Sequence, residues 1–111
     1  MSIDEKQFNQ LAEATMSAIE EAVEASGADI DYDTISDILT LEFADGSKII
    51  INKQGPTRQL WVAARSGGYH FDYDPEQRRW VLDSNPQQEL FECLSRYCSE
   101  QAGETVELTE E

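Results

Sequence analysis

The side chains that suit a buried face change their spacing after Gly27, from helical steps to strict alternation. Before Gly27 they recur every three or four residues, at Phe8, Leu11, Ala12, Thr15, Met16, Ile19, Ala22 and Val23. Ser2 and Glu5 have the spacing of a capping box, and Gly27 suits a left-handed helix cap. From Asp29 to Leu82 the period is two, which is typical of strands. We therefore expect one helix followed by a run of strands.

Turn signals divide the alternating region into about six strands. Asp45-Gly46 predicts a hairpin, while Gln54-Gly55-Pro56 and Ser66-Gly67-Gly68 interrupt the alternation further on. The expected strands cover residues 29–33, 39–43, 48–52, 59–64, 69–73 and 79–82. Strands that follow one another through short turns predict an antiparallel meander.

A second helix is expected near the end of the chain. Asn85-Pro86 provides a cap and a first-turn proline, and Gly103 would close the helix. Its apolar face comprises Leu90, Phe91, Leu94, Tyr97 and Cys98. Residues 104–111 form a short acidic tail in which Val106 and Leu108 can still pack. The prediction is an α+β fold, a two-layer α/β sandwich with both helices on one face of the sheet and one domain spanning residues 1–111.

Negative charge limits the partners that this chain can bind. The net charge is −15, from 23 acidic and 8 basic residues, and Lys6 is the only base among the first 45 residues. Such a field repels nucleic acids and anionic lipids but attracts cations and basic protein surfaces. Solubility alone is the simpler interpretation of an acidic surface. The chain has no apolar run that could span a bilayer and no signal-peptide pattern, so we expect a cytoplasmic protein.

The acidic residues concentrate on one helix face and one strand face. The second half of the first helix carries glutamates on its outer side with no lysine spaced to compensate them, and the aspartates of strand 29–33 share one side. Carboxylates without histidine or thiolate suit hard cations such as iron, magnesium or manganese, bound weakly and at several positions. The aspartates are not a calcium loop, because Thr34 and Thr40 occupy the positions of its glycine and glutamate.

Catalytic motifs are absent from the sequence. His70 lies on the same strand face as Asp72, but the chain has no nucleophile elbow, phosphate-binding glycine loop or supported Cys/His dyad. Cys93 and Cys98 are five residues apart in a helix, so they point in different directions and are expected to stay unpaired in a reducing compartment. We therefore expect no catalytic site.

Trp61 is expected on the face of the sheet away from the helices. Leu60 and Val62 alternate with it and suit the side beneath the helices. A large aromatic on an open sheet either packs against neighbouring outer residues, such as Ile50, or anchors a protein partner. Both interpretations remain open at this point.

Several segments resemble the frataxin family, in particular its bacterial CyaY type. The most specific are the run from Gly46 to Gln54 and the tryptophan strand Gln59–Ala63. The others are Ile19–Glu21, Asp29–Asp31, Leu39–Leu41, Gly67–Asp72 and Gln101–Thr105, so the similarity runs almost end to end. The chain departs from more acidic members at Ala25 and Ser26, and we expect it to carry no targeting segment of the kind found in mitochondrial members.

The resemblance implies a non-enzymatic protein that binds ferrous and ferric iron weakly through a ridge formed by the first helix and first strand. It also implies docking on the cysteine desulfurase and scaffold complex of iron–sulfur cluster assembly, by a monomer with iron-driven self-association left open. The implied metal ligands are Glu20, Glu21, Glu24, Asp29, Asp31 and Asp33, and the implied partner-binding residues are Glu20, Glu21, Glu24, Trp61, Asn52 and Gln54. The alternative is a purely protein-binding acidic module with incidental metal affinity, and ferroxidase activity ranks third.

Overall fold

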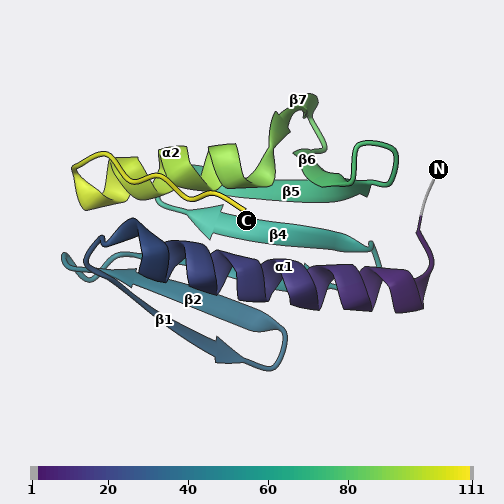
Figure 1. Cartoon of the computed structure of the whole chain (residues 1–111), viewed down its shortest axis with the longest axis horizontal. Coiled ribbons are helices and arrows are strands. Elements are labelled where there is room, and N and C mark those ends of the chain that lie inside the picture. The colour runs from purple at the N-terminus through teal and green to yellow at the C-terminus, as the bar shows by residue number, and fades with distance from the viewer. Residues whose placement is uncertain (1–2, 111) are drawn as a thin grey trace.

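Seven strands form one antiparallel sheet whose spatial order follows the chain, and two helices lie side by side on one of its faces (Figure 1). The computed structural model describes residues 3–110. In chain order the elements are α1 (Glu5–Ser26), β1 (Ile30–Ile35), β2 (Ile38–Phe43), β3 (Lys48–Gln54), β4 (Gln59–Ala64), β5 (Gly67–Asp74), β6 (Arg79–Leu82), β7 (Asn85–Glu89) and α2 (Leu90–Ala102). The α+β sandwich and the meander are confirmed, but the sheet has one more strand than expected.

The extra strand is β7, where the sequence predicted the start of the second helix. Asp83 and Ser84 turn the chain back, so that Leu82 pairs with Asn85 and Val81 with Glu89. Proline is tolerated there because β7 lies at the edge of the sheet, where a missing N–H breaks no ladder. The helix begins at Leu90, and the Glu89 carboxylate accepts hydrogen bonds from the first-turn N–H groups. The helix start predicted at Asn85-Pro86 is therefore wrong.

The capping box of α1 involves other residues than those predicted. Asp4 accepts a hydrogen bond from the Gln7 N–H at 2.8 Å, and the Gln7 side chain accepts one from the Asp4 N–H at 3.2 Å. Ser2 lies outside the described residues. At the other end Gly27 has a φ of 73°, the left-handed conformation that favours glycine, and it closes the helix as expected. Neither helix within residues 3–110 is long and apolar enough to cross a membrane.

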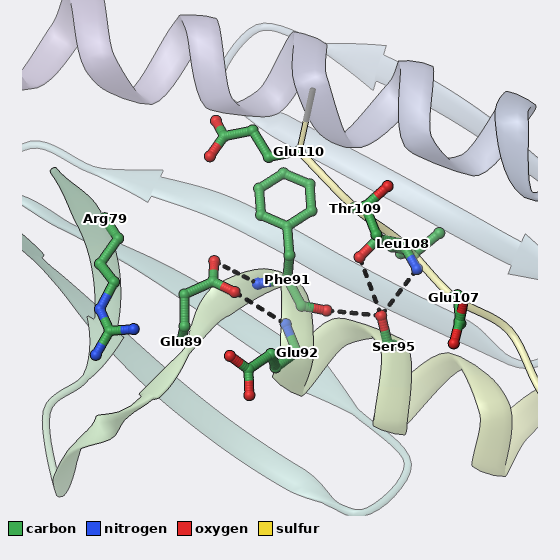
Figure 2. Close-up of a pocket in the computed structure, with 9 residues that line it drawn as sticks. All are labelled: Arg79, Glu89, Phe91, Glu92, Ser95, Glu107, Leu108, Thr109 and Glu110. Carbon is green, nitrogen blue, oxygen red and sulfur yellow. Dashed lines mark hydrogen bonds between the residues drawn. The ribbon is translucent and has the colours of Figure 1, made fainter. Parts of the chain in front are cut away.

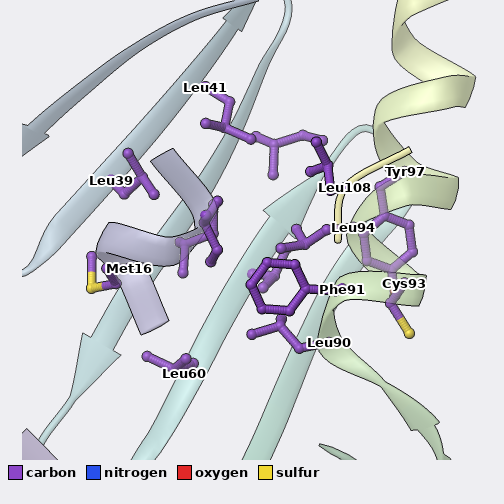
Figure 3. Packing of buried hydrophobic residues seen from close by; sticks show 14 of the residues in the cluster. Met16, Leu39, Leu41, Leu60, Leu90, Phe91, Cys93, Leu94, Tyr97 and Leu108 are labelled. Carbon is purple, nitrogen blue, oxygen red and sulfur yellow. The ribbon is translucent and has the colours of Figure 1, made fainter. Parts of the chain in front are cut away.

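Alternation along the strands separates a buried face from an open one. Met16 of α1, Leu39 and Leu41 of β2, Leu60 of β4 and Phe91 of α2 belong to one cluster of buried side chains between the helices and the sheet (Figure 3). The buried Thr15 hydroxyl accepts a hydrogen bond from the Trp80 indole N–H at 2.9 Å. The opposite face of the sheet carries no helix (Figure 1). Functional side chains on that face are therefore accessible.

The acidic tail is part of the packed structure. Val106 and Leu108 are 3% and 2% exposed, and both belong to the hydrophobic core. Ser99 donates to the Val106 carbonyl at 3.1 Å, and the hydroxyl of Ser95 accepts from the Leu108 N–H at 2.8 Å. The tail runs alongside α2 toward the space between the two helices (Figures 1 and 2). The expectation that its two apolar residues pack is confirmed.

Candidate acidic binding surface

Three glutamates project from the second half of α1, next to strand β1. Glu21 and Glu24 are exposed and Glu20 is half-buried. The Tyr32 hydroxyl donates a hydrogen bond to Glu24, and the Thr34 hydroxyl donates one to Glu20. The bond to Glu24, together with burial and the two negative charges, raises the pKa of Tyr32 above its ordinary value. These contacts hold the two glutamates against the edge of the sheet.

The strand aspartates lie on the other side of the same edge. Ile30 is buried and Tyr32 and Thr34 face α1, so alternation places Asp31 and Asp33 on the open face of the sheet. Asp29 precedes the strand instead of belonging to it, which corrects the expected strand of residues 29–33. Because β1 is an edge strand, the helix glutamates and strand aspartates meet around its free side. We name this set the acidic edge: Glu20, Glu21, Glu24, Asp29, Asp31 and Asp33.

One acidic neighbour was missed by the sequence analysis. Glu42 of β2 is directly paired with Asp31, so two like charges face each other across strands, and Glu42 pairs on its other side with Lys48. Together with neighbouring residues these three line a shallow hollow of about 240 Å³ on the open face. The two-residue turn Ser36-Asp37 sets this register, so recognising it would have identified Glu42.

No basic side chain among residues 3–110 forms an ion pair with the acidic edge. Within residues 3–110, the ion pairs leave out all six of its carboxylates. Lys53 contacts Glu13 at 3.5 Å and Asp37 at 3.4 Å, and Arg65 contacts Asp45 at 2.7 Å. The bonds from Ser47 and Arg65 lower the pKa of Asp45 to about 2. These bases are therefore engaged elsewhere, and the acidic edge can attract external cations.

The carboxylates are aligned but do not converge on one point. Among the described residues, no group of three or more His, Cys, Asp or Glu side chains is placed to hold one metal ion. A hard cation at this surface would therefore be held by one or two carboxylates and by water. Such a donor set fits weak and exchangeable binding.

Trp61 lies on the open face and stacks on His70 of the neighbouring strand. The ring centroids are 4.3 Å apart with an interplanar angle of 13°, and the indole N–H donates to Gln59 at 2.8 Å. Asn52 is the cross-strand neighbour of Trp61, and Gln54 pairs with Gln59. His70 is therefore one packing partner of Trp61, and the half-buried ring still offers contact area.

The only histidine pairs with a different aspartate from the one considered above. His70 Nδ1 lies 3.8 Å from a carboxylate oxygen of Asp83. Asp72 shares its strand face but accepts a hydrogen bond from Gln59 at 3.0 Å. The imidazole therefore lies between Trp61 and Asp83.

Comparison with known proteins identifies the family. Residues 1–104 match the family model described as Frataxin-like domain. This chain belongs to the frataxin family. It is 46% identical over 110 residues to the iron-sulfur cluster assembly protein CyaY of Ectopseudomonas mendocina, and 44% identical over 110 residues to the protein of that name in Pseudomonas syringae pv. tomato. Both matches cover 99% of each chain.

A solved frataxin structure has the same fold. The frataxin from Psychromonas ingrahamii matches with a TM-score of 0.87 and 41% sequence identity. The match covers 97% of this chain and 100% of that one. The resemblance to the CyaY type of frataxin is thereby confirmed over nearly the whole chain.

One hollow in this frataxin is lined by none of the residues of the acidic edge. A cleft of about 560 Å³ lies between α2, the tail and β6, lined by four glutamates together with Arg79 and Phe91 (Figure 2). The two carboxylate oxygens of Glu89 cap α2 by accepting hydrogen bonds from the N–H groups of Phe91 and Glu92. Burial raises the pKa of Glu89. The cleft therefore contains a structural cap and a docked tail, and it lies outside the surface predicted from the sequence.

The two thiols of this frataxin are buried, free and inert. Cys93 and Cys98 are both unpaired, as the sequence predicted. Burial raises the pKa of both, to about 12 for Cys98. Because the thiolate is the reactive form, neither cysteine is a nucleophile at neutral pH.

Proposed function

We propose that this frataxin is an iron-binding acidic adaptor that docks on the cysteine desulfurase and scaffold complex of iron–sulfur cluster assembly, and regulates cluster formation there or supplies iron to it. The observation that supports this most is the acidic edge, whose six carboxylates take part in no ion pair within residues 3–110. The relatives named as iron-sulfur cluster assembly proteins support the biological setting. On this proposal the chain works in the cytoplasm as one domain without a catalytic site.

The placement of its charges supports docking through the acidic edge. Glu21 and Glu24 are exposed on α1, and Asp31 and Asp33 are exposed on the adjoining strand. A partner with a basic surface gains attraction from both sides of the edge, and the summed field speeds its approach. The hydroxyl groups of Tyr32 and Thr34 restrict the side chains of Glu24 and Glu20 through hydrogen bonds. These two side chains therefore lose less conformational entropy when a partner binds.

The same carboxylates support weak association with iron. Carboxylate oxygens suit ferrous and ferric iron, and high local negative charge raises the cation concentration at the edge. Because no three ligands converge among the described residues, each ion keeps water in its coordination shell and exchanges easily. Easy exchange suits a protein that passes iron on or responds to its concentration.

Titration with ferrous iron under anaerobic conditions tests the metal part of this proposal. Amide NMR signals of residues 20–33 are expected to broaden first at physiological salt, because a bound paramagnetic ion relaxes nearby nuclei. Replacing Glu20, Glu21 and Glu24 with glutamine should reduce this broadening, whereas glutamine at Glu92, Glu107 and Glu110, which line the cleft between α2, the tail and β6, should leave it unchanged. If wild-type signals around residues 20–33 persist at full intensity, iron binding at the acidic edge is wrong.

The absence of three converging ligands among the described residues favours a second candidate, a purely protein-binding acidic module with incidental metal affinity. The two candidate functions predict different results in the iron titration and the same result for docking on the desulfurase. No broadening, together with intact desulfurase binding, would select the protein-binding module.

A further inference from the structure

The large hydrophobic side chains that are most exposed among the described residues all lie on the open face of the sheet. They are Ile35 at 69%, Ile38 at 42% and Ile50 at 37% exposed. Ile35 and Ile38 are the last directly paired residues of the β1–β2 hairpin. Single exposed hydrophobic residues are ordinary, but several gathered on one face indicate an interaction surface.

Strand pairing makes these three isoleucines continuous with Trp61. Ile38 is paired with Asn52, and Asn52 is paired with Trp61, so the row crosses the open face from the hairpin to the aromatic stack. Ile50 precedes Asn52 by two residues on β3, which places it diagonally between Ile38 and Trp61. We name Ile35, Ile38, Ile50 and Trp61 the open-face patch.

Carboxylates border this patch along the same face. Asp33 is two residues before Ile35 on β1 and points to the same side, and the hollow lined by Asp31, Glu42 and Lys48 adjoins it. At the other end of the row, His70 stacks on Trp61 and contacts Asp83. The patch is therefore an apolar centre with a mainly acidic rim, which is complementary to an apolar centre with a basic rim.

We propose that Ile35 and Ile38 are an apolar anchor point of the docking surface, and that the partner places an aliphatic or aromatic side chain over them, flanked by lysine or arginine residues facing the aspartates. This inference rests on the proposed function and adds to it a contact that charge alone does not supply. A second copy of this chain is the less suitable occupant, because its net charge of −15 repels an identical surface.

The test compares two double variants of equal shape. I35T/I38T and I35V/I38V both keep β-branched side chains and differ only in replacing a methyl group by a hydroxyl. The probe is the bacterial cysteine desulfurase, titrated at low and at high salt. We expect I35T/I38T to bind about tenfold or more weakly at both salt concentrations, since burial of apolar surface is not screened, and I35V/I38V to bind within about threefold of wild type.

The outcomes separate this inference from the proposed function. If wild type binds and I35T/I38T binds equally well, the apolar anchor is wrong while docking through the acidic edge stands. If wild type itself does not bind, both proposals fail. Sedimentation of the chain alone completes the test, because self-association that is present in wild type and lost in I35T/I38T would make a second copy the occupant. The single variant I35T, at the more exposed position, serves if the double variant melts early.

Discussion

Replacing Glu20, Glu21 and Glu24 with lysine is expected to weaken binding to the cysteine desulfurase by about 100-fold or more at low salt. The substitutions turn attraction into repulsion for any basic partner surface, at three positions within about one helical turn. The fold should persist, because Glu21 and Glu24 are exposed and Glu20 is half-buried on the outer side of α1. Titration calorimetry measures the binding, and a thermal melt measures the fold.

A control with the same charge change separates a local effect from a general one. Lysine at Glu92, Glu107 and Glu110 changes the net charge equally, but these residues line the cleft between α2, the tail and β6 (Figure 2). We expect this control to bind within about tenfold of wild type, because only the long-range field changes. Equal losses in both variants would mean that total charge, and not the acidic edge, governs binding. Full binding by the edge variant would place the interface elsewhere.

Replacing Leu108 with alanine is expected to cost about 2–4 kcal/mol of unfolding free energy. Its side chain is 2% exposed and belongs to the hydrophobic core, although most of the neighbouring tail residues are acidic or polar. A loss of this size is a large share of the 5–15 kcal/mol that stabilises a typical domain. Urea denaturation followed by circular dichroism measures it, and the unfolding midpoint should fall with little change in slope.

The neighbouring glutamate provides the matched control for the tail. Glu107 is exposed between Val106 and Leu108, so Glu107→Ala should change stability by no more than about 0.5 kcal/mol. If Leu108→Ala were as mild as Glu107→Ala, the tail would not be docked in solution. If both were severe, the charge of the tail would contribute to stability in addition to its packing.

Much of the fold follows from periodicity in the sequence. The switch from helical steps to alternation, with Gly27 between them, locates α1 and the strands, and it assigns Leu60 and Val62 to the buried side with Trp61 on the open side. The start of α2 could not be found in this way, because Asn85-Pro86 has the composition of a helix start. Residues 85–89 form a strand because they pair with β6. The local propensity of a segment does not reveal which other segment it will pair with.

The candidate site was predictable in its residues and not in its shape. Periodicity indicates the glutamates on α1 and the aspartates near β1, but their arrangement around an edge depends on which strand lies outermost. Glu42 and the exposed pair Ile35 and Ile38 depend on the register that the Ser36-Asp37 turn sets. The stack of Trp61 on His70 likewise requires the β4–β5 register.

Mapping the desulfurase footprint on this frataxin tests docking through the acidic edge most directly. Unlabelled cysteine desulfurase is added to ¹⁵N-labelled chain, and amide signal losses are followed residue by residue. The account predicts that losses begin in the second half of α1 and in β1, and extend across the open face to Trp61. Losses confined to α2, the tail and the cleft beside Glu89, with the signals of residues 20–33 unchanged, would contradict it.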